Sequence, residues 1–571
     1  MGIQRFGSRM RDYATRMTLG TTDSLKDTSI AIIDGPGLAH YIYYGMCDNA
    51  TGPVTYRRSA EATKAWLDRL EQFGFKIDAI LFDGALPSSK KDVRIDRLQN
   101  YTNRLQAFKQ SSTSSLSSLD GQARKSLPPP PFLVFALVEE LLLSNYADVT
   151  YVVPGEADPY CIAAAQALPA DSKSITIFSD DADLLVYKAS KACRIVPFRD
   201  LSESEMTSGI VLTCDAYNTS ELVRRCQTPI EDLVKPAYFM SMDHHCTLEK
   251  AFQKTASSNP ELREDFNDFA KSFESTMEAD QLVSIRADPT SKAALASRDS
   301  RISELVHQLR ADDPGGLRMY LPFLSDDPTR ASAWNIGVEI RSLAYSILLQ
   351  ACNSESSIQE YKRSGSRIAS SSIEPLEIIT MASMADELVS DMKRVKAVPG
   401  LGSQLKGADG WRYLAMQHTL AHLYKEESTL PSVDEIAQVV MNREARKWHT
   451  FHLAAQYQAT YYSLRMLRQL LAHASSQATT ASWDASFTNL NALLADLPSV
   501  SSFFDDKAGT DRRKEHERWC GMLQVLLSRF SSSERQDSQT QSRPKKKAKK
   551  QKKTNADDAR LVQNPFAMLA D

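Results

Sequence analysis

Between residues 29 and 243, short apolar runs rich in β-branched residues alternate with longer segments whose apolar residues recur at helical spacing. The short runs predict strands, and the segments between them, such as 60–73 and 131–143, are long enough to be crossover helices. This alternation is typical of a doubly wound α/β domain with a mainly parallel central sheet. Strands are expected at residues 29–34, 77–83, 149–153, 175–179 and, as a fifth, 193–198.

The pattern changes twice along the chain. Residues 111–131 are rich in Ser and end in a run of Pro, so we expect a flexible insertion at about 105–131. After residue 250 the strand pattern fades and helical patterns dominate, and two Ser- and Asp-rich stretches near 288–300 and 353–373 are interpreted as loops. The longest helical patterns lie at 338–349, 385–396 and 451–473.

These changes divide the chain into three predicted parts. The first is an α/β domain at 1–250, and the second is an α-helical region at 251–530. The third, at 531–571, is polar, basic and poor in apolar residues, which favours a disordered tail, and it ends in a short apolar motif.

Composition removes several classes of function. The formal net charge is only −3, so any contact with a nucleic acid must come from local basic patches. The eight cysteines are scattered without a CxxC pair, and His244, His245 and Cys246 have no second ligand pair at suitable spacing, so zinc is rejected. The most apolar stretch, 132–143, is too short to span a bilayer, and no membrane association is expected.

Acidic residues follow four of the expected strands, at the end where each strand finishes. Because the carboxyl ends of strands in an open α/β sheet form the crevice where ligands bind, these acids should converge. An Asp-Gly after one strand is also an ordinary turn signal, but four strand ends in order are harder to explain as turns. The acids are Asp34, Asp83, Glu156, Asp158, Asp180, Asp181 and Asp183.

Such a cluster predicts bound cations. Crowded carboxylates raise one another's pKa values unless a cation neutralises them. Ligand sets made of oxygen alone favour Mg²⁺ or Mn²⁺ over zinc. Two such ions side by side can activate water and stabilise the leaving oxygen in phosphodiester cleavage, so the pattern indicates hydrolysis of nucleic acid.

The order of the motifs makes the interpretation more specific. MGI, IIDGPGLAHYIY, ILFDGALPSSK, VPGEADPYCIAA and FSDDADLLVY occur in sequence. Over roughly residues 1–245 the chain resembles the flap endonuclease or XPG-like superfamily of PIN-type nucleases. The resemblance implies a PIN-like fold in which two metal ions are bound by the acids at Asp34, Asp83, Glu156, Asp158, Asp181 and Asp183.

The same resemblance implies three further site residues. Asp243, some way after the fourth strand, stands where the superfamily has a last metal ligand, and Lys90 and Arg97 stand where it uses cations near the scissile phosphate. Asp158 replaces the commoner Glu, which is a mild change. The usual pattern around Asp243 is lost and the Gly-rich hairpin that grips duplex DNA is missing after it, and these two departures leave the substrate open.

A second resemblance concerns the middle of the chain. WNIGVEIRSLAYSIL and FHLAAQYQATYYSLRMLRQLLA are similar to segments of fungal asteroid-type proteins, which join an XPG-like domain to a helical region. The apolar positions of the second segment are those of a buried helix, so a structural role is preferred for them. VPGLGSQLKG at 398–407 resembles a DNA-binding hairpin, although a Pro-Gly loop between helices is the simpler interpretation.

Together these features predict a Mg²⁺- or Mn²⁺-dependent, structure-selective endonuclease acting on DNA rather than RNA, for example in repair. The alternative is a catalytically weak or inactive protein of the nuclease fold that binds nucleic acid or regulates RNA after transcription. The run RPKKKAKKQKK at 543–553 indicates import into the nucleus. The terminal segment NPFAML is interpreted as a docking site for an unidentified protein partner.

Overall fold

The computed structural model describes residues 3–537 apart from short gaps. The gaps are 4–5, 22–28, 50–53, 112–120, 170–173, 188–192, 207–208, 219–220, 223, 225–232, 244, 258–259, 261–262, 312–315, 400, 402–406, 478–484 and 507–510. Several features predicted from the sequence therefore lie outside the described residues. They are the middle of the insertion, His244, most of the 398–407 loop, the basic run and the terminal motif.

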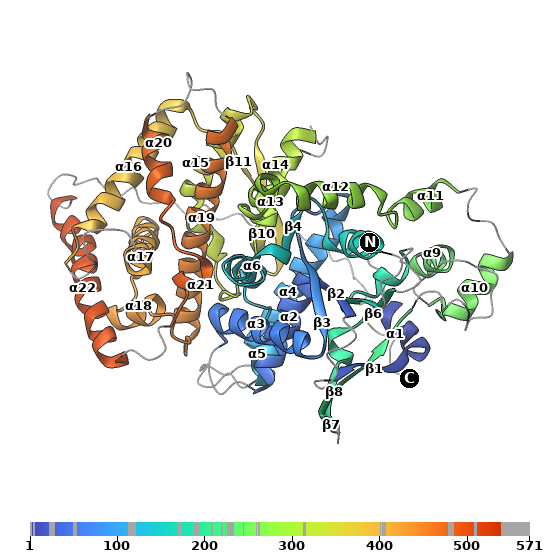
Figure 1. Cartoon of the computed structure of the whole chain (residues 1–571). Helices are drawn as coiled ribbons and strands as arrows, with labels where there is room; N and C mark the ends of the chain where they lie inside the picture. The colour runs from blue at the N-terminus through green and yellow to red at the C-terminus, as the bar shows by residue number, and fades with distance from the viewer. Residues whose placement is uncertain are drawn as a thin grey trace, which may run out of the picture. The chain divides into compact units, whose positions relative to one another are not determined.

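A five-stranded parallel sheet forms the centre of the N-terminal part (Figure 1). Its strand order is β4-β3-β2-β5-β6. The strands carry long runs of buried apolar residues, as expected of a parallel sheet that is covered on both faces. The predicted α/β fold is confirmed, and the fifth strand is present. The strands are β2 (Ser29–Asp34), β3 (Phe75–Asp83), β4 (Thr150–Val153), β5 (Ile175–Phe178) and β6 (Cys193–Val196).

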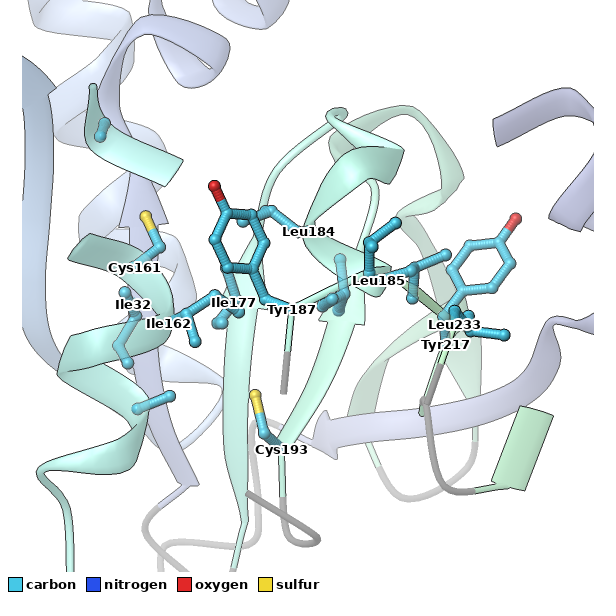
Figure 2. Close-up of a cluster of buried hydrophobic side chains, with 14 of the residues drawn as sticks. Ile32, Cys161, Ile162, Ile177, Leu184, Leu185, Tyr187, Cys193, Tyr217 and Leu233 are labelled. Atoms are coloured by element: carbon cyan, nitrogen blue, oxygen red, sulfur yellow. The ribbon is translucent and has the colours of Figure 1, made fainter. Parts of the chain in front are cut away.

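Helices cover the two faces of this sheet because successive strand residues point to opposite sides. Ile177 packs with α7 (Ala157–Gln166), and Figure 2 shows it near Ile32, Cys161 and Ile162. The next residue, Phe178, contacts Trp66 on the other face, with ring centroids 5.9 Å apart. The helices of that second face are α2 (Gly35–Asn49), α3 (Tyr56–Gln72) and α6 (Leu133–Leu142).

A small antiparallel sheet that the sequence did not predict lies next to β6. Its order is β1-β8-β7, formed by Thr15–Thr21, Gly209–Ala216 and Ser202–Met206. An antiparallel bridge between Ile195 and Tyr217 connects it to the parallel sheet. The strand β7 is exposed along its whole length and reads SESEM, so it lacks the apolar alternation by which strands are recognised.

The predicted insertion is partly helical. Helix α4 (Lys91–Ser111) continues through residues 105–111, and α5 (Gly121–Ser126) follows the gap. Helix α4 packs against a strand far away in sequence, where the Gln99 amide donates to the Ser366 carbonyl at 2.8 Å and accepts from the Ile368 amide at 3.2 Å. Within the segment itself, Lys109 Nζ lies 3.1 Å from Asp327 Oδ2, and the rings of Phe108 and Trp448 have centroids 6.0 Å apart. These long-range contacts explain why residues 105–111 are more ordered than the composition indicated.

Helices dominate after residue 233, as the sequence predicted. They are α9 (Val234–Met242), α10 (Leu248–Ser257), α11 (Glu264–Lys271), α12 (Thr276–Ala287), α13 (Pro289–Ala296), α14 (Ser300–Ala311), α15 (Val338–Ala351), α16 (Ile378–Lys396), α17 (Ala408–Lys425), α18 (Val433–Val440), α19 (Trp448–Gln477), α20 (Ala485–Leu494), α21 (Val500–Phe503) and α22 (Arg512–Asp537). The three long helical patterns fall in α15, α16 and α19.

Both loop predictions in this region were wrong. Residues 288–300 contain α13, whose first turn is capped by Asp288, with Pro289 at the first helical position. Residues 353–373 contain the hairpin of β10 (Ile358–Ser364) and β11 (Arg367–Ile373). Strand β10 also pairs in parallel with β9 (Leu317–Tyr320), so a third sheet, β11-β10-β9, stands among the helices.

By its internal contacts the chain divides into two compact units, Met1–Gln524 and Val525–Asp571. All the described strands belong to the first unit, which therefore contains both the parallel sheet and the third sheet. The division into domains at residue 250 stays a prediction. In the described part of the chain, none of the helices has the length and apolar character needed to cross a membrane.

Candidate functional site

The acidic residues lie where the sheet changes its winding direction. From β2 the chain proceeds outwards through β3 to β4, whereas β5 and β6 lie on the other side of β2. The carboxyl ends of β2 and β5 therefore form a switch point, the usual ligand-binding position of open α/β sheets. Asp34 ends β2 and Asp83 ends β3, while the remaining acids directly follow β4 and β5.

Asp34 is held at the centre of this edge. Its side chain is 8% exposed, and its carboxylate accepts hydrogen bonds from the Gly37 amide at 3.0 Å and the Ser179 hydroxyl at 2.7 Å. A Cβ atom at position 37 would lie 2.4 Å from Asp34 Oδ2, so the turn after β2 needs glycine there. Burial raises the pKa of Asp34 to about 7, and repulsion from Asp83 and Asp181 adds to the effect.

Asp83 connects the ends of two neighbouring strands. Its Oδ1 accepts a hydrogen bond from the Ala157 amide at 2.7 Å, at the start of α7. Burial raises the pKa of Asp83, and the nearby Glu156 raises it further. Gly84 permits this arrangement, because a Cβ atom there would lie 1.8 Å from the Val153 carbonyl oxygen.

The two acids after β4 have different surroundings. Glu156 forms an ion pair with Lys90, in which Lys90 Nζ lies 2.5 Å from Glu156 Oε1. Asp158 lies one residue into α7 and faces other acids. Burial raises the pKa of Asp158 well above its usual range, and four neighbouring carboxylates raise it further: Asp181, Asp34, Asp83 and Glu156.

The acids after β5 are ordered by a short 3₁₀ helix, Ala182–Leu185. Asp181 caps it by accepting a hydrogen bond from the Asp183 amide at 2.8 Å, while the Asp181 amide donates to Ser179 Oγ at 3.0 Å. Asp183 accepts from the Ile3 amide at 3.1 Å, so the start of the chain reaches the cluster. Burial raises the pKa of Asp183 to about 7, with Asp181 adding to it.

These six acids influence one another electrostatically, and we call them the acidic cluster: Asp34, Asp83, Glu156, Asp158, Asp181 and Asp183. Asp180 is not part of it. One Asp180 oxygen lies 3.9 Å from Arg199 Nε, and the group receives backbone hydrogen bonds from Phe198 and Arg199. Its role is to fix the loop after β6 rather than to face the cluster.

The structure does not bring Asp243 into the acidic cluster. Asp243 follows α9 and is exposed, and its carboxylate accepts a hydrogen bond from the His245 amide at 2.9 Å and lies 3.9 Å from Lys254 Nζ. The His245 hydrogen bond, with help from Lys254, lowers the pKa of Asp243. This acid therefore behaves as the cap of a turn, consistent with the lost sequence pattern around it.

The cations after Asp83 divide into paired and unpaired groups. Lys90 pairs with Glu156, as described above, and Arg94 is buried 2.6 Å from Glu304 of α14. Arg97, in contrast, is exposed, and within the described part of the chain no hydrogen bond or ion pair holds its guanidinium. Of these three cations, Arg97 alone can bind an anionic ligand without first breaking an ion pair.

The donor atoms of the acidic cluster suit a hard divalent cation, but their positions do not form a complete binding site. Its donors are carboxylate oxygens, which Mg²⁺ and Mn²⁺ prefer, and burial without compensating charge leaves them needing a cation. However, among the residues that the structure describes, no three His, Cys, Asp or Glu side chains converge in a way that could hold a metal ion. Lys90 and the Ile3 amide occupy Glu156 and Asp183 instead.

Sequence reasoning missed two features of this site. Ser179 joins Asp34 to Asp181, and its place directly before the acidic run was a signal that could have been used. The other is the approach of α14 and its neighbours to Asp83, where residues near 298–301 line the same cavity as Asp83 and Arg97. No local pattern could have revealed that approach, because it depends on packing between distant segments.

The comparisons with known proteins agree with this geometry. Residues 129–375 match the protein family described as XPG domain containing, a span from α6 to β11 that includes the acids after β4 and β5. This part of the chain is therefore similar to XPG domains. Asp34, Asp83 and the cations of α4 lie before the matched span, so their assignment rests on the sequence motifs and the geometry.

A curated relative points the same way. Over 190 residues the chain is 26% identical to Asteroid homolog 1 of Schizosaccharomyces pombe, a stretch covering 33% of this chain and 30% of the relative. The matched part is thus less than a third of that protein's length. Both comparisons confirm the resemblance to asteroid-type, XPG-like proteins and support a protein of the nuclease family.

Proposed function

We propose that this protein is a Mg²⁺- or Mn²⁺-dependent endonuclease that hydrolyses phosphodiester bonds in flap, single-stranded or otherwise structured DNA. The observation that carries the proposal is the acidic cluster at the switch point of the sheet. Six carboxylates from four adjacent strand ends gather there, and the pKa values of four of them, Asp34, Asp83, Asp158 and Asp183, are raised by burial and by repulsion from neighbouring acids. Maintaining such a cluster costs stability, which a structural role would not require.

We assign the six acids to two positions for a cation. Asp34, Asp83 and Asp158 are central and would hold the first ion, with Asp181, Asp183 and Glu156 completing the second position. When bound, two such ions supply an activated water and stabilise the leaving oxygen. Glu156 is paired with Lys90 through Oε1, so a cation bound by this oxygen would replace the ion pair, and the Lys90 ammonium group would then be available to a phosphate.

Arg97 has a complementary role. Burial raises the pKa of Asp83, and the positive charge of Arg97 offsets part of this rise, so Arg97 stands at the border of the cluster. A guanidinium presents several donors in one plane and suits the oxygens of a phosphate group. We assign Arg97 to orienting the scissile phosphate and stabilising the charge that develops on it.

The test is cleavage of labelled flap, hairpin and single-stranded DNA by the full chain with Mg²⁺ or Mn²⁺. Asp181→Ala should lower the rate by more than about 100-fold, because even residues behind metal ligands change activity by about 10–100-fold. Asp180→Asn is the matched control, since this neighbouring acid faces Arg199 and should leave the rate unchanged. Equal cleavage by wild type and Asp181→Ala, or none by wild type, refutes the proposal.

A second candidate is a nuclease-fold protein that binds nucleic acid, or regulates RNA, without efficient cleavage. It is favoured by one observation, that no three ligands converge among the described side chains. Binding of DNA or RNA by the wild type without metal-dependent cleavage supports this candidate. RNA versions of the same substrates decide between the two nucleic acids in the same experiment.

We also propose that the protein is nuclear, on the basis of the basic run at 543–553. Deleting residues 540–571 should abolish nuclear accumulation of a fluorescent fusion. The same accumulation before and after the deletion contradicts this assignment. Binding of a protein partner by NPFAML is a separate proposal, tested by whether the full chain retains proteins that a chain shortened before residue 561 does not.

A further inference from the structure

A cavity of about 220 Å³ lies directly beside the acidic cluster. Asp83 and Arg97 border it on the side of the α/β domain, and α6 contributes Phe135. The opposite wall comes from far later in the chain, including Arg298 and Arg301 at the start of α14. The helices after residue 250 therefore build half of a cavity that opens onto the proposed site.

The cavity wall is cationic. It contains five arginines but only three carboxylates, namely Asp83, Glu139 and Asp299. A second cavity, of about 540 Å³ beside Glu156, has lysines and arginines matched by equal numbers of acids. The excess of positive charge is thus specific to the cavity beside Asp83.

Two of the five arginines form buried ion pairs with carboxylates. Arg465 binds both oxygens of Asp299, at 2.6 and 2.7 Å, and Glu139 at 2.5 Å. Arg94 Nη1 lies 2.6 Å from a Glu304 oxygen, although the Arg94 guanidinium makes no hydrogen bond to the described residues. Since buried ion pairs of this kind are structural, these two residues hold the cavity together rather than bind a ligand.

The other three arginines keep donors for a ligand. Arg301 lies 3.7 Å from Glu304, whose charge is already shared with Arg94. Arg298 contacts His473 at 3.0 Å, and burial lowers the pKa of His473 to about 4, so that histidine is neutral near pH 7. Arg298 Nε is buried without a hydrogen-bond partner among the described residues. Arg97, exposed and unpaired as described above, is the third.

Much of the rest of the wall is apolar. Tyr101 and Phe323 lie with ring centroids 5.5 Å apart and ring planes inclined by 58°, and Pro36 and Leu86 contribute further apolar surface. Aromatic rings beside arginines are the surface on which unpaired bases stack. The volume of about 220 Å³ is smaller than the roughly 300 Å³ at which ordinary ligand pockets begin, so the cavity is too small for a base pair.

We propose that this cavity binds one unpaired nucleotide next to the cleaved bond, with Arg298 and Arg301 holding its phosphate and Tyr101 and Phe323 its base. The inference rests on the proposed function and deepens it by assigning a subsite for the unpaired strand. It also makes two arginines outside the α/β domain determinants of specificity, and Arg97 links their subsite to the acidic cluster.

The test measures binding rather than cleavage. The full chain is titrated in EDTA against a fluorescein-labelled oligodeoxythymidylate and against a hairpin duplex, with fluorescence anisotropy as the readout. Arg301→Gln and Arg298→Gln should each weaken binding of the single strand about tenfold, the effect of losing a charge-assisted hydrogen bond, without changing duplex binding. Arg310→Gln is the matched control, because Arg310 is an exposed residue of α14 outside the cavity.

The outcomes separate the two proposals. Unchanged single-strand binding by both cavity variants, equal losses for duplex and single strand, or no single-strand binding by wild type overturns the inference even if cleavage occurs. A selective loss in the cavity variants supports the inference even if the wild type cleaves nothing, in which case the endonuclease proposal alone fails. Melting curves of the variants identify any that do not fold, and two independent arginines keep the test decisive.

Discussion

The acidic cluster and the interior of the helical region solve the problem of buried carboxylates in opposite ways. In the helical region, Glu360 is fully buried but receives Arg341 at 2.6 and 3.0 Å and the Tyr345 hydroxyl at 2.8 Å. Burial alone raises the pKa of Glu360, yet these partners outweigh it and leave the pKa below its ordinary value. Asp34 and Asp158, by contrast, face other acids and have raised pKa values.

This difference separates stability from function. Both carboxylate oxygens of Glu360 accept hydrogen bonds from Arg341. The carboxylate therefore fixes the position of β10 against α15 and has no oxygen left for a ligand. The acidic cluster is left short of positive charge at an edge that also carries Arg97. Burying charges without partners destabilises a fold, and perturbed groups of this kind concentrate at functional sites.

The largest change in stability should come from removing the partner of a buried, ion-paired carboxylate. Arg465→Ala removes the partner of both Asp299 and Glu139 and leaves two carboxylates buried, which should lower the free energy of unfolding by about 3–5 kcal/mol. Urea denaturation followed by circular dichroism measures it. A loss below about 1 kcal/mol would mean that water reaches Asp299 and Glu139 and replaces the arginine as their partner.

Removing an acid from the cluster should have the opposite sign. Without divalent cations, Asp34→Asn should stabilise the protein at pH 8 by up to about 4 kcal/mol, because the folded state no longer carries a charge whose pKa it raises to about 7. Wild-type stability from this group is complete below the unfolded pKa of about 4 and is lost as the pH rises through the folded value.

The gap between wild type and Asp34→Asn should therefore vanish near pH 4 and widen towards pH 8. Melting temperatures in EDTA across this range measure it. A variant that is less stable than wild type at every pH would show that the hydrogen bonds from Gly37 and Ser179 outweigh the charge penalty.

Lys90 resembles the partners of the matched carboxylates, because it forms an ion pair with Glu156 of the acidic cluster. Lys90→Met should lower stability at pH 7 by roughly 1 kcal/mol, since Glu156 loses a charged partner that is about three-quarters buried. Urea denaturation again provides the measurement. Stabilisation by Lys90→Met would indicate that the pair costs more in desolvation than it returns.

The smallest effect is expected at the surface. Lys425 and Glu339 form an ion pair at 3.3 Å, but their side chains are 63% and 65% exposed. Lys425→Ala should change the free energy of unfolding by less than about 0.5 kcal/mol, and this change should disappear in high salt. A larger change would undermine the assumption that burial, rather than pairing, decides these effects.

The sequence predicts the central sheet and the acidic cluster well, since both depend on local patterns. A β-branched run followed by Asp-Gly places Asp34 and Asp83 at strand ends without any knowledge of the rest of the chain. The hairpin of β10 and β11 was missed because its Ser-rich second strand is ordered by pairing and by contact with Gln99 of α4, not by its own composition.

The environment of individual side chains was the least predictable feature. Arg94 stood beside the expected phosphate-binding residues in sequence, yet it is buried against Glu304, more than two hundred residues away. Asp243 matched the superfamily by position but caps a turn instead. Arg298 and Arg301 reach the cavity only through packing of α14, which no single segment encodes.

The most direct test of the acidic cluster as a cation site is calorimetric titration of the full chain with MnCl₂ near pH 7, in two buffers of different ionisation enthalpy. We predict saturable binding with release of protons from the raised-pKa acids, and an affinity at least about tenfold lower in Asp158→Asn but unchanged in Asp180→Asn. No uptake of Mn²⁺ by the wild type, or equal affinity in wild type and Asp158→Asn, would contradict the account.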